Sequence, residues 1–234
     1  SAQEFKREFQ FISASGFSSL TETTISNASE IANTDGSYEE YALVSYFGRA
    51  NYNFKDKYLF TATVRRDGSS RFGRNNRYGV FPSASAAWNL SRETFLQSSP
   101  IISDLKVRVS YGFSGNQEIG NYRSVANMAI VDLAYPFGEQ TAVGTWATNV
   151  PNDDLRWEQT AQTDIGVDLS LFQNRIQVTL DYYQKNTTDV LIARQLPVIS
   201  GFPEFVWQNL GEVKNQGFEF AIKSYNLSGE FSWN

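Results

Sequence analysis

Apolar and polar residues alternate along most of the chain from residue 41 onward, and the clearest run is 175–185. On one parity this run carries Ile176, Val178, Leu180 and Tyr182, and on the other Gln177, Thr179, Asp181 and Tyr183. Successive side chains of a β-strand point to opposite faces, so this spacing predicts a strand with one apolar and one polar face. The preceding run, 163–171, alternates in the same way, and only a short polar turn at Gln173-Asn174 separates the two. The pair therefore predicts an antiparallel hairpin.

The same alternation predicts eight strands in all. They lie near residues 41–53, 58–67, 78–90, 104–114, 161–171, 175–186, 213–225 and 229–234. Pro82 removes a backbone donor from the third of them, so we expect a bulge or a strand end at that point. Residues 1–40 are mixed in period and rich in Ser and Thr, which predicts a loop-rich segment.

The predicted connections alternate in length, which is typical of one class of β-protein. Those after Asn53, Phe172 and Tyr225 are short, those after Asp67, Ser114 and Asn186 are long, and the one after Leu90 is intermediate. Transmembrane barrels have short turns on the periplasmic side and long loops outside. The strands run to about 11–13 residues, roughly twice the usual globular length and enough to cross a bilayer at a tilt.

The polar parity carries charges that bear on what covers each face. They are Arg49, Arg65, Arg108, Asp164, Asp168, Asp181, Glu219 and Lys223. In a dry core each unpaired charge would cost several kcal/mol. A water-filled channel removes that cost, and so does a solvated outer sheet face. The charges therefore fit both a transmembrane barrel and a soluble β-sandwich.

Composition excludes several classes of function. The chain has no Cys and no His, which rules out zinc–thiolate sites, disulfides, Cys nucleophiles and His-based triads. Its net charge of −5 argues against a general nucleic-acid partner. No run approaches the roughly 20 apolar residues of a membrane helix, whereas a barrel strand needs only about 9–11 residues. The aromatic content of 15% suits a sheet surface or an aromatic girdle.

Several short motifs occur in a characteristic order. They are Arg65-Arg66-Asp67-Gly68-Ser69-Ser70-Arg71-Phe72-Gly73 with Phe81-Pro82-Ser83, Leu105-Lys106-Val107-Arg108 with Ser110-Tyr111-Gly112, Gly115-Asn116-Gln117, Leu155-Arg156-Trp157-Glu158, Gly166-Val167-Asp168, Asp181-Tyr182-Tyr183 with Thr188-Asp189, Asn209-Leu210-Gly211, and Asn215-Gln216-Gly217-Phe218-Glu219. With this ordered set the chain resembles the SusC/RagA class of TonB-dependent outer-membrane transporters of Bacteroidetes.

The resemblance implies an all-β fold, namely an antiparallel up-and-down transmembrane β-barrel section with long extracellular loops. About eight long strands would belong to a larger barrel of about 22 strands. Residues 1–40 would then be a loop-rich extracellular segment, and 41–234 the barrel section. The first and last residues look like the interior of a longer protein, so we expect a fragment without the plug.

The resemblance also implies a function and partners. It implies import of a nutrient such as an oligosaccharide or a peptide across the bacterial outer membrane, with no enzymatic activity and no cofactor. The partners would be outer-membrane lipid, a SusD-like surface lipoprotein, and TonB through a plug region that has no counterpart here. The alternative from a different class is a soluble β-sandwich that acts as a carbohydrate-binding or adhesive module.

Two groups of residues are candidates for ligand contact. The first is the Arg cluster of Arg71, Arg74 and Arg77, together with Arg65, Arg66 and Asp67. It suits either an anion-binding rim, for lipopolysaccharide phosphates or an acidic ligand, or a loop base in which Arg and Asp are paired. The second is Trp146, Trp157 and Trp207, whose rings suit sugar stacking or a membrane-interface girdle.

Carboxylates form the remaining candidates. Asp164, Asp168 and Asp181 would serve either as a hydrolytic carboxylate pair or as the lining of a pore, and their spread along one face favours the pore. Asn152, Asp153 and Asp154 lack the alternate-residue spacing of a hand-type Ca²⁺ loop, which favours a solvated loop. We therefore predict neither a catalytic nor a metal site.

Overall fold

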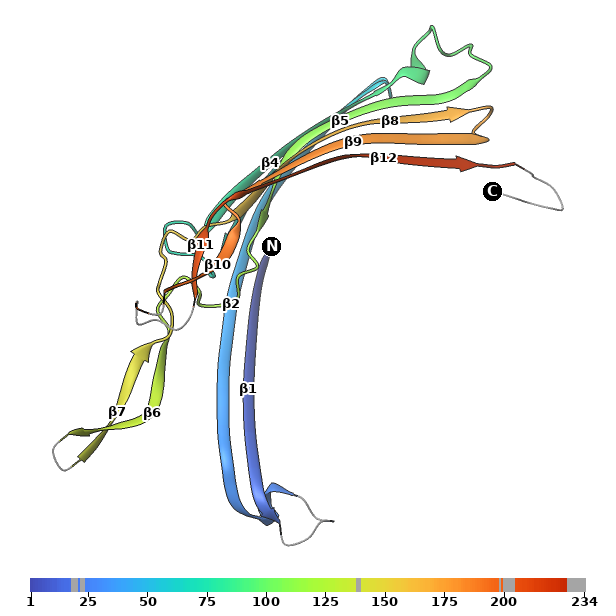
Figure 1. The fold of residues 1–234 in the computed structure, drawn as a ribbon. Coiled ribbons are helices and arrows are strands. Elements are labelled where there is room, and N and C mark those ends of the chain that lie inside the picture. The colour runs from blue at the N-terminus through green and yellow to red at the C-terminus, as the bar shows by residue number, and fades with distance from the viewer. Residues whose placement is uncertain (18–20, 22–23, 138–139, 198, 200–204, 227–234) are drawn as a thin grey trace.

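A computed structural model describes residues 1–17, 21, 24–137, 140–197, 199 and 205–226. Its main feature is one curved eight-stranded sheet, antiparallel throughout, in the order β1-β2-β3-β4-β5-β8-β9-β12 (Figure 1). The strands are β1 (Ala2–Phe17), β2 (Ala28–Phe54), β3 (Tyr58–Ser69), β4 (Tyr78–Asn89), β5 (Ile102–Asn116), β8 (Glu158–Leu171), β9 (Ile176–Thr188) and β12 (Glu212–Ser224). The sheet is open, with β1 and β12 at its edges, so within the described residues it is a section of an up-and-down barrel wall.

The strands predicted from alternation are present for the first seven ranges. They correspond to the second half of β2 and to β3, β4, β5, β8, β9 and β12. The eighth predicted strand, 229–234, lies outside the described residues. The strand has no bulge at Pro82, because β4 pairs with β3 in unbroken register there. The pairing of β4 with β5 begins at the next residue, Ser83, which lies opposite Gly112.

The prediction of a loop-rich segment over residues 1–40 is wrong in its secondary structure. Strand β1 pairs with residues 28–44 of β2, and together they form a long two-stranded ribbon, here called the arm (Figure 1). Strand β3 pairs only with Leu43–Phe54 of β2, so the arm extends beyond the seven-stranded part of the sheet. Apolar and polar residues alternate in the arm as well, but charged residues occur on both faces, so the sequence did not indicate a strand there.

The two long connections also contain strands that the sequence did not predict. A hairpin of β6 (Met128–Phe137) and β7 (Gln140–Ala147) lies between β5 and β8, and β10 (Leu191–Gln195) pairs with β11 (Phe205–Asn209) between β9 and β12. All of these, together with the arm, lie at the same end of the sheet (Figure 1).

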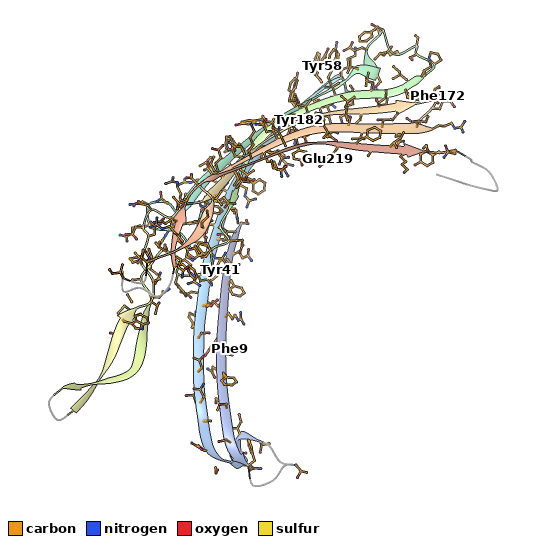
Figure 2. The ribbon with its side chains drawn as sticks, viewed as in Figure 1. Phe9, Tyr41, Tyr58, Phe172, Tyr182 and Glu219 are labelled. Carbon is orange, nitrogen blue, oxygen red and sulfur yellow. The ribbon has the colours of Figure 1, made fainter. Side chains whose placement is uncertain are left out.

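The sheet is a single layer with two different faces. One continuous row of neighbouring residues across seven strands is Tyr52, Phe60, Ala86, Val109, Ile165, Tyr182 and Phe218; the adjacent row is Asn51, Thr61, Ser85, Ser110, Asp164, Tyr183 and Gly217. On the apolar face, Phe220 is 66% exposed and Leu180 47%. Figure 2 shows Tyr58, of the apolar parity, on the convex side of the sheet and Glu219, of the polar parity, on the concave side. A sandwich would bury the apolar face between two layers, so the soluble-sandwich alternative is wrong.

The parity reverses where the arm leaves the sheet. In the arm, Phe5, Phe9 and Tyr41 lie on the face that continues the polar side of the sheet, and Phe5 stacks on Tyr41 with ring centroids 5.3 Å apart. Glu4 and Lys6 lie on the opposite face, as an ion pair at 3.0 Å. The convex face therefore changes from apolar to charged near residue 43, which marks the edge of the apolar band.

Tight turns close the other end of the sheet. Three residues, Lys55 to Lys57, separate the paired residues Phe54 and Tyr58. Lys55 and Asp56 both have positive φ, and the Asp56 backbone N–H donates to Asn53 Oδ1 at 3.0 Å. The turn between β8 and β9 likewise has positive φ at Phe172, Gln173 and Asn174. Within the described residues, no helix has the length and apolar character needed to cross a bilayer.

Candidate functional site

The polar concave face of the sheet is the first candidate site, and small hydroxyl side chains line its centre. Thr61, Ser83, Ser85 and Ser110, with Gln162 beyond them, border a hollow of about 300 Å³. These side chains are short, so they leave space next to this part of the sheet, and their hydroxyls can both donate and accept hydrogen bonds. A polar solute or another part of the same protein can thus approach the wall closely here.

An ion network lies next to this hollow on the same face. Arg108 donates through Nε to Asp168 Oδ2 at 2.8 Å and through Nη2 to Asp181 Oδ1 at 2.9 Å, which joins β5, β8 and β9. Thr179 donates to Asp168 at 3.3 Å. Of the three Asp side chains considered for a carboxylate pair, Asp168 and Asp181 are therefore partners of an arginine on the concave face.

Gly166 gives the guanidinium of Arg108 its space. It lies opposite Arg108 on β5 and Asp181 on β9. A Cβ built on Gly166 would come within 2.1 Å of Asp181 Oδ1 and 2.8 Å of Arg108 Cζ. The ion pairs thus depend on a glycine between the two partners.

Gly166→Ala is expected to destabilise the full-length barrel by about 1–3 kcal/mol, because the added methyl group overpacks the ion network. Gly48→Ala is the matched control, since a Cβ there meets nothing within 4 Å. Urea unfolding of both variants measures the effect. Equal stability of the two variants would show that the close packing around Arg108 is unimportant.

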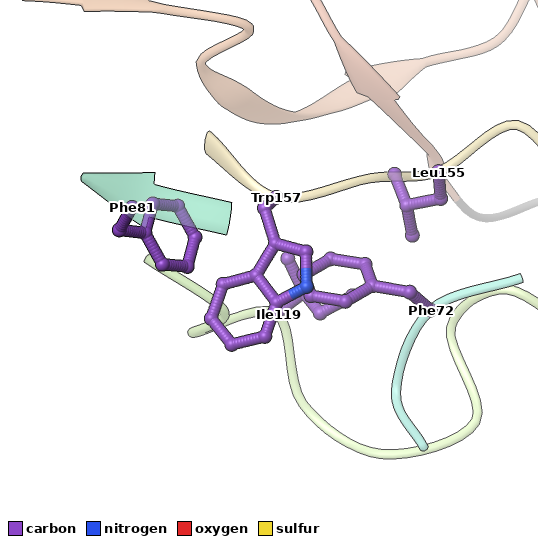
Figure 3. Close-up of a cluster of buried hydrophobic side chains, with 5 residues drawn as sticks. All are labelled: Phe72, Phe81, Ile119, Leu155 and Trp157. Carbon is purple, nitrogen blue, oxygen red and sulfur yellow. The ribbon is translucent and has the colours of Figure 1, made fainter. Parts of the chain in front are cut away.

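A buried aromatic cluster forms the second candidate site, at the base of the long connections. Its members are Phe72, Phe81, Ile119, Leu155 and Trp157 (Figure 3). Trp157 packs against Phe72 at 5.2 Å and Phe81 at 5.5 Å between ring centroids, and its Nε1–H donates to the Arg77 carbonyl at 2.9 Å. Gly73 completes the packing, since a Cβ there would lie 2.0 Å from the Asp153 carbonyl oxygen. The cluster joins three connections that are distant in sequence.

Arg71, from the predicted Arg cluster, is directed into this loop base. Its side chain is only 10% exposed. Nε donates to Asn121 Oδ1 at 3.1 Å, Nη1 donates to the Gln117 carbonyl at 3.3 Å, and the guanidinium lies 4.2 Å from the Tyr41 ring centroid. Arg71 therefore connects Tyr41 of β2 with the connection after β5.

The other predicted ligand residues are divided between core and surface. Trp157 is 5% exposed and packs against Phe72 and Phe81, and Trp207 of β11 is half-buried against the same cluster. Arg74 and Arg77 are exposed, and Trp146 of β7 is 40% exposed. The structure thus leaves Arg74, Arg77 and Trp146 accessible.

Segments that carried the sequence resemblance meet at this end of the sheet. Arg156 Nη2 donates to Asp189 Oδ1 at 2.7 Å, and this carboxylate raises the pKa of Arg156. Asn209 accepts from the Arg156 backbone N–H at 3.0 Å and donates to the Asp189 carbonyl at 2.9 Å. Sequence analysis quoted these motifs separately and did not predict that they bind one another, because their contacts span 20 to 53 residues.

The mouth of the concave face holds a further hollow of about 340 Å³. Thr63, Arg65 and Asp67 of β3 and Gln117 and Glu118 from the connection after β5 border it. Arg65 Nε lies 2.7 Å from Asp67 Oδ2, so the positive charge here is partly neutralised. Charged and polar side chains thus border this hollow next to the loop base, where a polar solute can form hydrogen bonds.

Within the described residues, no group of three or more Asp or Glu side chains is arranged to hold a metal ion. Asn152, considered for Ca²⁺, donates to the Trp207 carbonyl at 2.7 Å and accepts from the Asp154 backbone N–H at 3.1 Å. Its amide thus holds the loop against β11.

At the short-turn end, Glu93 anchors the apolar face. It accepts from Lys57 Nζ at 2.9 Å, Tyr58 Oη at 3.0 Å and Trp88 Nε1 at 3.2 Å. Tyr58 and Trp88 stack at 6.0 Å, so one carboxylate orients two rings of an aromatic girdle. The hydrogen bond from Lys57, followed by those from Trp88 and Tyr58, lowers the pKa of Glu93.

Glu93→Gln is expected to be less stable than the wild type at neutral pH and to approach it in acid. A carboxylate with a lowered pKa in the folded state stabilises above its unfolded pKa, and this stabilisation is lost as the pH falls through the folded pKa. Unfolding midpoints of both proteins between pH 7 and pH 3 measure this. A constant difference over that range would contradict a role for the ionised carboxylate.

Comparisons with known proteins give a consistent result. The family model described as "TonB dependent receptor-like, beta-barrel" matches residues 3–234. The chain is 45% identical to TonB-dependent receptor P3 of Formosa agariphila, over 83% of this chain and 19% of that protein, and 38% identical to TonB-dependent receptor SusC of Bacteroides thetaiotaomicron, over 82% of this chain and 19% of that protein. It superposes on the structure of the RagAB peptide transporter with a TM-score of 0.87 and 33% identity, covering 98% of this chain and 25% of the other. The chain therefore spans about a fifth of the length of the curated relatives it matches.

Proposed function

Because this chain belongs to the family of TonB-dependent receptor-like β-barrels, we propose that it forms part of the wall of a transporter that imports a nutrient through the bacterial outer membrane. Barrels of this family, SusC and RagA among them, are outer-membrane proteins. The observation that carries the proposal is the two-faced single sheet. Its apolar rows suit hydrocarbon, and its paired charges and hydroxyls suit a hydrated interior.

The proposed cargo is an oligosaccharide or a peptide. One relative is SusC, and the RagAB structure is described as a peptide transporter. Both classes of solute are rich in hydrogen-bonding groups, which the hydroxyl-lined hollow and the hollow at the mouth can meet. Arg74, Arg77 and Trp146, which are exposed among the long connections, are the proposed additional contacts. The proposal assigns no enzymatic reaction to the chain.

The proposed partners follow from the ends of the sheet. A SusD-like surface lipoprotein would cover the long-connection end, where Phe5 and Phe9 of the arm expose 40% and 45% of their surface on the inward face. TonB would act through a plug formed by another part of the full-length protein. The free edges of β1 and β12 would pair with further strands of the same barrel, as a closed barrel requires.

Uptake by living cells tests this function. A strain that lacks the gene for the full-length protein is compared with the same strain complemented by it, and mass spectrometry follows depletion of mixed oligosaccharides and mixed peptides from the medium. Depletion of one class only in the complemented strain supports import and identifies the cargo class. Equal depletion of both classes in the two strains would overturn the proposal.

A further inference from the structure

The convex, lipid-facing side of the sheet contains an apolar groove of about 690 Å³. Its floor is a row of small residues on three adjacent strands, Ala50, Ala62 and Ala84. The rings of Tyr52 and Phe60 border the row on the short-turn side, and Tyr111 of β5, the neighbour of Ala84, borders it laterally. The volume lies within the range of about 300–1,000 Å³ that is usual for small-molecule sites.

A cation lies on the same face, beyond the groove in the direction of the long connections. Arg66 shares the parity of Ala62 on β3, and its guanidinium lies 4.5 Å from the ring centroid of Tyr78. It is exposed, and within the described part of the chain no carboxylate forms an ion pair with it. An arginine at the edge of a lipid-facing surface requires water or an anionic headgroup.

The spacing of the two features fits one lipid molecule. Arg66 and Ala62 are four residues apart on one strand, or about 13 Å. The long connections mark the outer side of the membrane in this architecture, so Arg66 lies at the level of the outer leaflet headgroups. A phosphate at Arg66 would allow an acyl chain to descend past Val64 onto the alanine floor. Arginine forks suit phosphate oxygens.

We propose that Arg66 and the alanine groove bind one lipid A unit of lipopolysaccharide, with a phosphate at Arg66 and an acyl chain on the groove floor. A free phosphate would leave the groove empty, and a neutral lipid would leave Arg66 without an anion. The site faces away from the channel, so it is independent of the cargo that the protein imports.

Binding of purified lipid A to the full-length protein in mild detergent tests the site, with dephosphorylated lipid A and phosphatidylglycerol as comparison ligands. Native mass spectrometry measures occupancy as a function of ligand concentration. Arg66→Gln is expected to weaken lipid A binding about tenfold, because it removes the charge-assisted hydrogen bonds from the guanidinium to the phosphate. The same variant should bind dephosphorylated lipid A as the wild type does. Ala62→Phe is expected to fill the floor and abolish binding of both.

Two variants control for general effects. Arg49→Gln removes an arginine from the concave face, where its Nε donates to Thr63 at 3.2 Å, and Leu180→Phe adds a ring to the convex face outside the groove. Both are expected to bind lipid A like the wild type. The proposal fails if Arg66→Gln and Ala62→Phe match these controls, if dephosphorylated lipid A binds as well as lipid A, or if phosphatidylglycerol competes equally.

Discussion

Replacing Trp157 by alanine is expected to lower the free energy of unfolding of the full-length protein by about 3–5 kcal/mol, the usual cost of removing a buried aromatic side chain. Trp157 is 5% exposed, packs on Phe72 and Phe81, and donates to the Arg77 carbonyl. Its removal leaves a cavity between three connections and an unpaired backbone acceptor. Because few other buried side chains hold these connections, the long loops should also become sensitive to protease.

Two further variants separate packing from ligand contact. Trp157→Phe keeps a ring in the cluster but loses the hydrogen bond to the Arg77 carbonyl. The lost hydrogen bond should lower the free energy of unfolding by about 1 kcal/mol, and the small cavity left by the shorter ring should lower it further. Trp146→Ala is the matched surface control, since Trp146 is 40% exposed, and should change stability by less than about 0.5 kcal/mol. Urea titrations and limited proteolysis measure both properties. A Trp157→Ala protein of wild-type stability with reduced cargo binding would reverse the assignment and make Trp157 a ligand contact.

The seven sheet strands could be predicted from the sequence because each must present apolar residues to lipid at every second position. This requirement produces a two-residue period of apolar side chains in the sequence, as in Ile176, Val178 and Leu180 of β9. The arm was not predicted because most of its side chains are exposed on both faces. Phe5 and Phe9 alternate with Glu4 and Lys6, yet Arg7 interrupts the apolar side, and backbone pairing with β2 supplies the structure that burial supplies elsewhere.

The candidate site was predictable only in part, because its contacts are distant in sequence. The sequence identified the charges of the concave face, but not that Arg108 would join Asp168 and Asp181, which are 60 and 73 residues away. For the Arg cluster the sequence allowed both a rim and a loop base. Arg71 contacts Gln117 and Asn121, and these contacts depend on how the connection after β5 folds.

Placing an arginine on the convex face in the middle of a strand is expected to impair folding into a bilayer strongly. Ala84 lies near the centre of β4 on the apolar face, and its side chain is exposed on the surface of the sheet. At the bilayer midplane an arginine on the lipid face costs about 2–4 kcal/mol. Ala84→Arg should therefore lower the free energy of unfolding of the full-length barrel by that amount and reduce the folded fraction in the outer membrane.

Ser85→Arg is the matched test of the two faces, because Ser85 is the next residue along β4, is also exposed, and has a side chain of similar size that points to the concave side. In a hydrated interior its charge keeps water or meets polar partners, so the stability should change by less than about 0.5 kcal/mol, while the hollow lined by Thr61 and Ser110 becomes narrower. Urea-dependent folding into lipid vesicles measures the difference between the two variants.

If Ser85→Arg were the more damaging substitution, the convex side would face water and the lipid-facing assignment of the whole sheet would be wrong. If both were harmless, neither side of the strand would contact hydrocarbon. Only a large loss for Ala84→Arg with little change for Ser85→Arg fits a wall with lipid on one side and a channel on the other.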